Sequence, residues 1–309
     1  MTRLVHEGLG WIDFAQQAHR VLHRAVPFDG SCWHPLDPST LLFTGYYAQN
    51  LHAEPRLPYH EYAIADVNKW AWLARSGKVV GVLSRATNGK LERSPRYRAL
   101  LRPRGIQHEL RMAFTDSGDA WGAGGMYRDA GRRDFDADEV RLIRVLSPLI
   151  AEGMRRSMLI TATPPKESVQ SPGVVIFDRN GELESVSESA AVMMADLVEQ
   201  GNHGKYPLLV TTLAELARRD GGPDGVPARA RVFTRSGNWL LLHGSRLAGG
   251  EEGRTAVVIE PARSPEVAPL LLAAYGLTRR ERDVTGHCLA GMSTKEIASF
   301  FLIYPHTVQ

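Results

Sequence analysis

Apolar residues recur along the chain with two spacings, which predict helices and strands in alternation. Ile12, Ala15, Ala18 and Leu22 follow a three- and four-residue spacing typical of an amphipathic helix. Strands are expected around 31–36 and 40–47, a helix over 61–77, and a hairpin whose strands 106–114 and 120–128 flank the turn-forming residues TDSGD. The first 160 residues therefore predict a mixed α+β domain.

A long helix should close this segment. Asp136 is placed to cap it, and Val140, Ile143 and Ile150 keep one apolar face, with Pro148 expected to kink the helix midway. Such a helix fits a dimer seam or a core helix, and both alternatives stay open.

Proline and polar residues interrupt the periodicity twice, at 161–172 and at 260–269. Between them, a strand at 173–177, the turn DRNGE, a second strand, a helix and three strand-like runs predict a second, smaller α+β unit. These interruptions predict domains over 1–160, 173–261 and 266–309.

The last segment predicts helix, turn and helix. Thr278 with Glu281, and Ser293 with Glu296, have the spacing of capping boxes, which start two helices. Gly291 lies where a left-handed helix end is needed. We expect Val284, Cys288 and Leu289 to form the apolar face of the first helix, and Ile297, Ala298, Phe301 and Leu302 that of the second. Pro305 suits the first position of a third helix.

Composition adds limits to this picture. The chain has 309 residues, is 43% hydrophobic and 23% charged, and carries two cysteines, values typical of globular domains in a reducing compartment. It shows neither a signal-peptide pattern nor an apolar run long enough to span a membrane, so we expect a cytoplasmic protein. A net charge of +3 permits a polyanionic partner without indicating one.

Three resemblances follow from these motifs. The first segment, through WGAGGMYRD and its terminal helix, resembles a GAF domain, an antiparallel sheet with flanking helices. The second, through GVVIFDRNGELESVSESAAVMM, resembles a PAS domain. The third is similar to the LuxR-type helix-turn-helix at Leu277, Thr278, Arg280, Glu281, Val284, Gly291, Ser293, Lys295, Glu296, Ile297, Ala298, Pro305, Thr307 and Val308. Taken together, they imply a GAF-like sheet with helices, a PAS-like α+β domain and a partial all-α helix-turn-helix.

The LuxR resemblance implies DNA contacts. In that family the third helix enters the major groove, so Thr307 and Gln309 would face bases and Lys295 the phosphate backbone. Tyr304 replaces the usual capping serine, Gly286 interrupts the first helix, and His287 stands where leucine is common. Completing the recognition helix and a fourth, dimerising helix would need roughly 30 more residues. We therefore expect a truncated recognition helix, with the residues after Phe301 either poorly packed or drawn into another contact.

Aromatic residues in the first segment predict a small-molecule pocket. The candidates are Trp33, Phe43, Tyr46, Trp70 and Trp121; for each one alone a core role is the better explanation, and the pocket is expected from the set together with the sensor-like architecture. Cys32 and His34 lie on one side of a strand. Some GAF domains attach a bilin through a cysteine, but the flanking residues do not match, and a plain strand is favoured.

Catalytic and metal-binding patterns are missing from the sequence. The histidines show no metal-ligand spacing, the GAGG segment lacks the lysine of a phosphate loop, and we expect no cofactor and no enzymatic activity. A turn explains Asp37, and a solvated helix face explains Asp66.

Two hypotheses result. The first is a DNA-binding transcriptional regulator, expected to be a homodimer, whose sensor domains respond to a small molecule or a protein. The alternative is a sensor or interaction protein that acts by dimerisation without binding DNA. A quorum-sensing receptor is disfavoured because the segment 173–260 separates the first domain from the helix-turn-helix.

Overall fold

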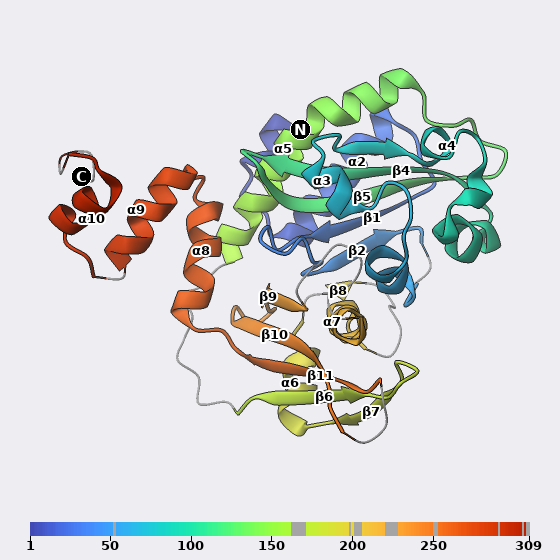
Figure 1. Cartoon of the computed structure of the whole chain (residues 1–309). Helices are drawn as coiled ribbons and strands as arrows, with labels where there is room; N and C mark the ends of the chain where they lie inside the picture. Colours follow the sequence, from blue (N-terminus) through green and yellow to red (C-terminus); the bar gives the residue numbers. More distant parts are fainter. Residues whose placement is uncertain are drawn as a thin grey trace.

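The computed structural model describes residues 1–51, 54–161, 171–197, 199–200, 206–219, 228–249, 253–289, 291–304 and 306. Two sheets with flanking helices form the body of the molecule, and three helices follow at one end (Figure 1). The predicted α+β class, with a helix-flanked antiparallel sheet in the first segment, is confirmed.

The first sheet has the strand order β3-β4-β5-β1-β2-β8. All neighbours are antiparallel except β8, which pairs in parallel with β2. The strands are β1 (Gly30–Pro35), β2 (Tyr46–Gln49), β3 (Val80–Val82), β4 (Ile106–Asp116), β5 (Asp119–Asp129) and β8 (Glu199–Gln200). Because β8 comes from the second segment, that segment contributes a strand to the first sheet.

The hairpin between β4 and β5 turns where the sequence predicts. Ser117 and Gly118 both have positive φ, +52° and +90°. Two such residues form the tight turn that fits the twist of paired strands. Asp119 therefore lies at the tip of the longest hairpin.

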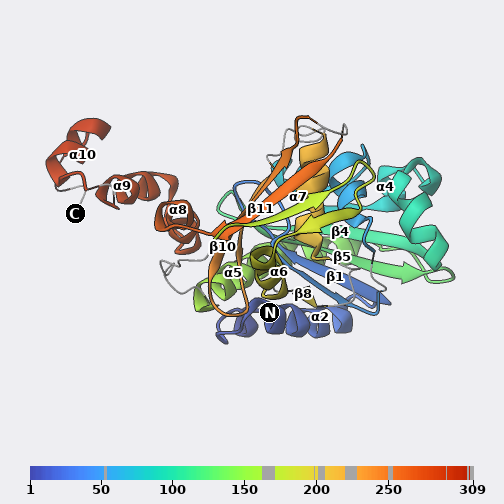
Figure 2. The same cartoon turned by 90° about the horizontal axis from the view of Figure 1, so that it is seen from below.

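Helices cover both faces of the first sheet. α2 (Trp11–Ala25) and α5 (Ala137–Thr161) pack on one face, called the outer face, and Asp136 caps α5 by accepting hydrogen bonds from the backbone N–H groups of Asp138 and Glu139. The shorter helices are α1 (Thr2–Val5), η1 (Tyr59–Ala63), α3 (Trp70–Arg75), α4 (Leu83–Ala86), η2 (Leu91–Arg93), η3 (Tyr97–Leu101) and η4 (Arg102–Arg104). α3 packs against β4 on the opposite side, called the inner face. Figure 2 shows α2 running along the outer face.

The predicted single helix over 61–77 is wrong. It is divided between η1 and α3, and Asn68 between them has φ +54°. The Glu61 carboxylate accepts a hydrogen bond from the Trp70 backbone N–H at 2.8 Å. A tertiary contact thus starts a new helix where sequence periodicity predicts continuation.

The second sheet is antiparallel, with the order β7-β6-β11-β10-β9. Its strands are β6 (Gly173–Phe177), β7 (Leu183–Val186), β9 (Arg229–Phe233), β10 (Trp239–Arg246) and β11 (Thr255–Pro261), and its helices are α6 (Glu188–Ala195) and α7 (Leu208–Arg218). The predicted strand, turn, strand and helix order is confirmed. α7 packs on β10 and on η1, so one buried apolar cluster runs through both segments.

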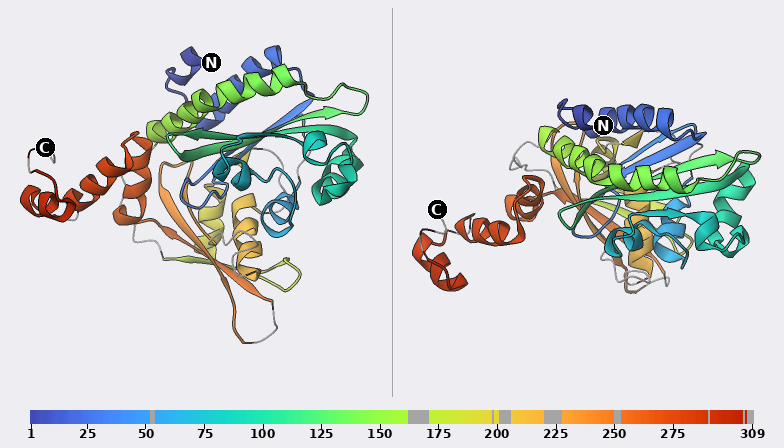
Figure 3. Two further views of the ribbon diagram at one scale, coloured as in Figure 1. Left: turned by 45° about the horizontal axis from the view of Figure 1, so that its top comes forward. Right: turned by 90° about the horizontal axis from the view of Figure 1, so that it is seen from above.

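The second predicted linker is wrong, because most of it is helical. α8 (Ser264–Ala274) begins within three residues of β11, with a proline in its first turn and the Glu266 carboxylate bonded to the Arg263 N–H. Its residues Val267 and Leu270 are buried. α8 packs against α5 and α9 (Arg279–Leu289), and α10 (Thr294–Phe301) follows (Figure 3). The division into 1–160, 173–261 and 266–309 stays a prediction.

Candidate functional site

Two of the five aromatic candidates lie on the outer face of the first sheet. Trp33 stacks on Phe114 at 5.5 Å, on the side covered by α2 and α5. Trp121 belongs to the same apolar cluster. Ala120 pairs with Thr115 and Gly122 pairs with Phe114, so Trp121 between them has no partner in β4 and forms a β-bulge. An extra residue in one strand reverses the side on which the side chain emerges. Both tryptophans are core residues.

The other three candidates meet on the inner face, around His34. The rings of Phe43, Tyr46 and Trp70 lie 4.1, 5.0 and 4.9 Å from the His34 ring. Tyr62 adds its ring at 5.2 Å from Phe43 and accepts a hydrogen bond from the Phe43 N–H. We call Phe43, Tyr46, Tyr62 and Trp70 the aromatic cluster; all four are buried, and their rings fill the space around His34.

A chain of ion pairs lies against the aromatic cluster. Arg111 bonds Glu61 at 2.6 Å and Glu109 at 3.1 Å, and its guanidinium stacks 3.8 Å from the Trp70 ring centre. Arg96 continues the chain from Glu109 to Asp66, at 2.7 and 3.2 Å. Burial alone would raise the pKa of Glu109, but Arg96 and Arg111 outweigh it and lower that pKa. We call these five residues the ion chain.

The ion chain overturns one expectation from the sequence. Asp66 is predicted on a solvated helix face, yet its side chain is almost completely buried. Its carboxylate accepts hydrogen bonds from the Ser94 hydroxyl and from the Arg96 backbone N–H. Since these partners lie about thirty residues away, no local pattern could have revealed them.

A small cavity lies beside the ion chain. Cys32, Tyr127 and Arg96 line a space of about 50 Å³, and the Cys32 thiol lies 3.4 Å from the Tyr127 hydroxyl. A Cβ on Gly125 would meet that hydroxyl at 2.5 Å, so the phenol ring occupies the place of a side chain. Burial raises the pKa of the Cys32 thiol to about 11, so it stays protonated at neutral pH.

A buried ion pair joins the first segment of the chain to the second. Asp37 lies in a turn, as predicted, where it accepts from the Ser39 N–H. It also receives both ends of the Arg231 guanidinium from β9, at 2.6 and 2.8 Å. Arg231 donates further to the Glu266 carbonyl in α8. Phe43 of the aromatic cluster belongs to the same hairpin as Asp37, through the Leu36–Phe43 bridge.

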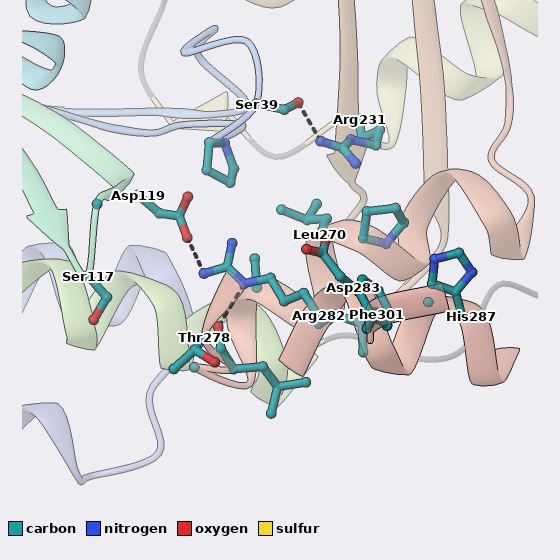
Figure 4. A pocket seen from close by; sticks show the side chains of 18 of the residues that line it. Ser39, Ser117, Asp119, Arg231, Leu270, Thr278, Arg282, Asp283, His287 and Phe301 are labelled. Carbon is teal, nitrogen blue, oxygen red and sulfur yellow. Dashed lines mark hydrogen bonds and ion pairs between the residues drawn. The ribbon is translucent and has the colours of Figure 1, made fainter. Parts of the chain in front are cut away.

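A groove of about 1330 Å³ separates this junction from α9 and α10 (Figure 4). One wall consists of the Ser39 loop and the β4–β5 turn, and the other of α8, α9 and α10. Arg282 of α9 crosses the groove to Asp119 at 2.6 Å and donates to the Leu277 carbonyl. Figure 4 shows the Arg282 side chain extended toward the turn.

The helices α9 and α10 begin at the two predicted capping boxes. Thr278 and Glu281 exchange hydrogen bonds, as do Ser293 and Glu296. Gly291, between the helices, has φ +84°. The local signals for helix, turn and helix are therefore confirmed.

The predicted apolar faces of these helices are only partly correct. Ile297 and Ala298 are buried, whereas Leu302, after the last turn of α10, is 93% exposed, and Cys288 and Leu289 face outward. The expected poor packing after Phe301 is confirmed at Leu302 and Tyr304. Lys295 is exposed in the first turn of α10, while Thr307 and Gln309 lie outside the described residues.

The described part of the chain contains no group of three His, Cys, Asp or Glu side chains arranged to hold a metal ion. Its helices are all too short or too polar to cross a membrane.

Comparison with known proteins gives structural likenesses only. No family model matches the chain. No curated protein matches it either. A GAF domain/HD domain protein from Geobacter sulfurreducens is 17% identical and has a TM-score of 0.37, covering 48% of this chain and 95% of that one. The VqsR LBD domain from Pseudomonas aeruginosa is 14% identical, with a TM-score of 0.35 and coverage of 48% and 87%. The bacteriophytochrome RpBphP3 from R. palustris is 9% identical, with a TM-score of 0.37 and coverage of 84% and 60%.

Proposed function

We propose that the chain is a transcriptional regulator in which the first domain responds to a signal and the α9–α10 segment belongs to a DNA-binding helix-turn-helix. The observation that carries the proposal is the pair of capping boxes, which start α9 and α10 on either side of Gly291. That arrangement supports helix-turn-helix geometry, with Lys295 free to approach a phosphate.

The proposed binding of a signal molecule is supported by the inner face of the first sheet. Aromatic rings, paired charges and a small cavity lie together there, a combination typical of sites that recognise small amphipathic molecules. We propose a cytoplasmic homodimer that changes state when the effector binds. Native mass spectrometry of the protein purified from its host should reveal a retained small molecule, and loss of this molecule in Tyr127→Leu would locate it.

The proposed DNA binding is tested by selecting duplexes from a random pool and measuring anisotropy across a salt series. The protein should bind the selected duplex with an affinity that falls steeply with salt, and Lys295→Gln should reduce the slope by about 1. If no duplex binds at any salt concentration, the proposed DNA binding is wrong.

An alternative is a sensor that acts through protein contacts alone. From Gly276 onward four basic residues are nearly balanced by three acidic ones, a weak footprint for DNA. Val145 on α5 is 65% exposed, as an interface residue on a dimer seam would be. This alternative predicts a stable dimer in sedimentation equilibrium, weakened by Val145→Glu, together with no DNA binding.

A further inference from the structure

Contacts at two places hold α8 and α9 against the first domain. Arg155, near the end of α5, donates to the Ala274 carbonyl at the end of α8 and lies 3.7 Å from Asp116. Arg282 of α9 reaches Asp119 at the other end of the same β4–β5 turn. One acidic turn of the first domain thus faces both helices.

Arg282 differs from the other described cations of the C-terminal segment. Arg280 stacks on Phe301 and donates to its backbone carbonyl, so its charge is not neutralised by a carboxylate. Lys295 is exposed. Only Arg282, within the described part of α9 and α10, is paired with a carboxylate from another domain. The pair is about one quarter exposed on each side, which makes it reversible rather than a fixed core contact.

We propose that the Arg282–Asp119 pair is an autoinhibitory latch. While it is closed, α9 is held on the β4–β5 turn and the Arg282 guanidinium is occupied. Asp119 accepts a hydrogen bond from one terminal nitrogen of the Arg282 guanidinium. A phosphate oxygen would accept from the same group, so a polyanion and Asp119 compete for Arg282. The identity of the competitor, DNA, rests on the proposed function, whereas the latch itself does not.

The chain carries its own probe position. Cys288 in α9 is exposed, whereas Cys32 is buried and its thiol has a pKa of about 11. A thiol reagent at neutral pH should therefore label Cys288 selectively. A nitroxide at Cys288 reports the mobility of α9, and hydrogen exchange of the α9 amides gives a label-free second readout.

The variants are Asp119→Asn and Arg282→Gln, which open the latch from opposite sides. Asparagine keeps the turn preference of Asp119, and Arg282→Gln leaves the turn untouched. Asp283→Asn is the matched control, because Asp283 lines the same groove and forms no ion pair among the described residues. Both latch variants should raise label mobility and speed α9 exchange about two- to fivefold, as expected for losing a partly exposed pair.

The charge exchange Asp119→Arg with Arg282→Asp should restore slow exchange. Unchanged α9 exchange in Asp119→Asn and Arg282→Gln overturns the latch, as does an equal effect in Asp283→Asn. Titration with the selected DNA duplex then tests the competitor, since a bound duplex should mobilise the label of the parent protein as Asp119→Asn does. A duplex that binds no variant contradicts the proposed function, while the exchange data still decide the latch.

Discussion

The two sheets have the same strand order but different interiors. Numbered within each domain, and leaving out β8, both follow the order 2-1-5-4-3. The first encloses the ion chain, five charged side chains that are almost completely buried. In the second, the buried polar side chains of the described residues are threonines: Thr212, Thr234 and Thr255.

This difference shows that topology does not determine what a sheet can do. An apolar interior supplies stability and little discrimination, whereas paired charges beside aromatic rings offer fixed directions for hydrogen bonds. The first sheet is therefore the better candidate for recognition, and the second connects it to α8 through Arg231.

The largest predicted effect comes from breaking the ion chain. Arg111→Met removes a partner from Glu61 and Glu109, and should lower the free energy of unfolding by about 3–5 kcal/mol, because carboxylates remain buried. Leu242→Met, at a buried position of the second sheet, should cost below about 1.5 kcal/mol. Urea unfolding followed by tryptophan fluorescence measures both. Equal losses would remove the distinction between the two interiors.

The next effect tests whether the two sheets unfold together. Arg231→Met should cost about 2–3 kcal/mol, somewhat less than a completely buried pair, because Asp37 keeps its charge without its main partner. Calorimetry should then resolve two transitions in place of one. Arg229→Met removes only an exposed contact to Glu266 and should cost below about 1 kcal/mol. A single transition in Arg231→Met would mean that the apolar cluster alone joins the domains.

Lowering the pH should weaken the ion pairs of Asp37 and Glu109 without any substitution. Burial raises the pKa of Asp37, but the charge of Arg231 and hydrogen bonds from Arg231 and Ser39 outweigh it and lower that pKa. Arg96 and Arg111 lower the pKa of Glu109 in the same way. Groups with lowered pKa stabilise the fold above their unfolded-state values, near 4, and this stability is lost as the pH falls through the folded-state pKa. The contribution of these carboxylates to the melting temperature should therefore change little from pH 7 to 5 and be lost below about pH 4. It adds to a decline that begins near pH 6.5, because burial lowers the pKa of His19 to about 4. Arg111→Met should reduce the loss due to the carboxylates, and an unchanged profile would contradict this assignment.

The smallest effect concerns α9, which is more loosely held than either sheet. A Cβ on Gly286 would meet nothing within 4 Å, so Gly286→Ala should stabilise α9 by about 0.5–1 kcal/mol through lower chain entropy. Gly291→Ala should act in the opposite direction, because its φ of +84° disfavours a side chain. Hydrogen exchange of α9 amides measures both, and the same sign for both would contradict the backbone argument.

Much of the architecture was predictable because it depends on local contacts. The capping boxes of α9 and α10, the Ser117–Gly118 turn and the Asp136 cap involve partners within four residues. Strand alternation likewise identified all three strands of β9–β11. Periodicity failed at 260–269, because proline in the first turn of α8 is compatible with a helix.

The candidate site was less predictable. Phe43, Tyr46 and Trp70 come together as their aromatic character suggested, but Trp33 and Trp121 lie across the sheet. The ion chain beside the aromatic cluster was not predicted, since Asp66 and Glu61 look like ordinary helix residues in the sequence. Three acidic residues and two arginines within a span of about fifty residues were the only sequence signal, and such spacing is common on solvated surfaces.

Local sequence sets where helices begin, where hairpins turn and which strands alternate, because those features depend on backbone hydrogen bonds between near neighbours. Long-range packing sets the positions of Trp121 in the outer-face cluster, of Asp66 against Arg96 and of Arg282 against Asp119. Asp66 and Arg96 are 30 positions apart in the sequence, and Arg282 and Asp119 are 163 positions apart. Ionic partners at that distance are chosen by the packing of whole sheets, which no short stretch of sequence encodes.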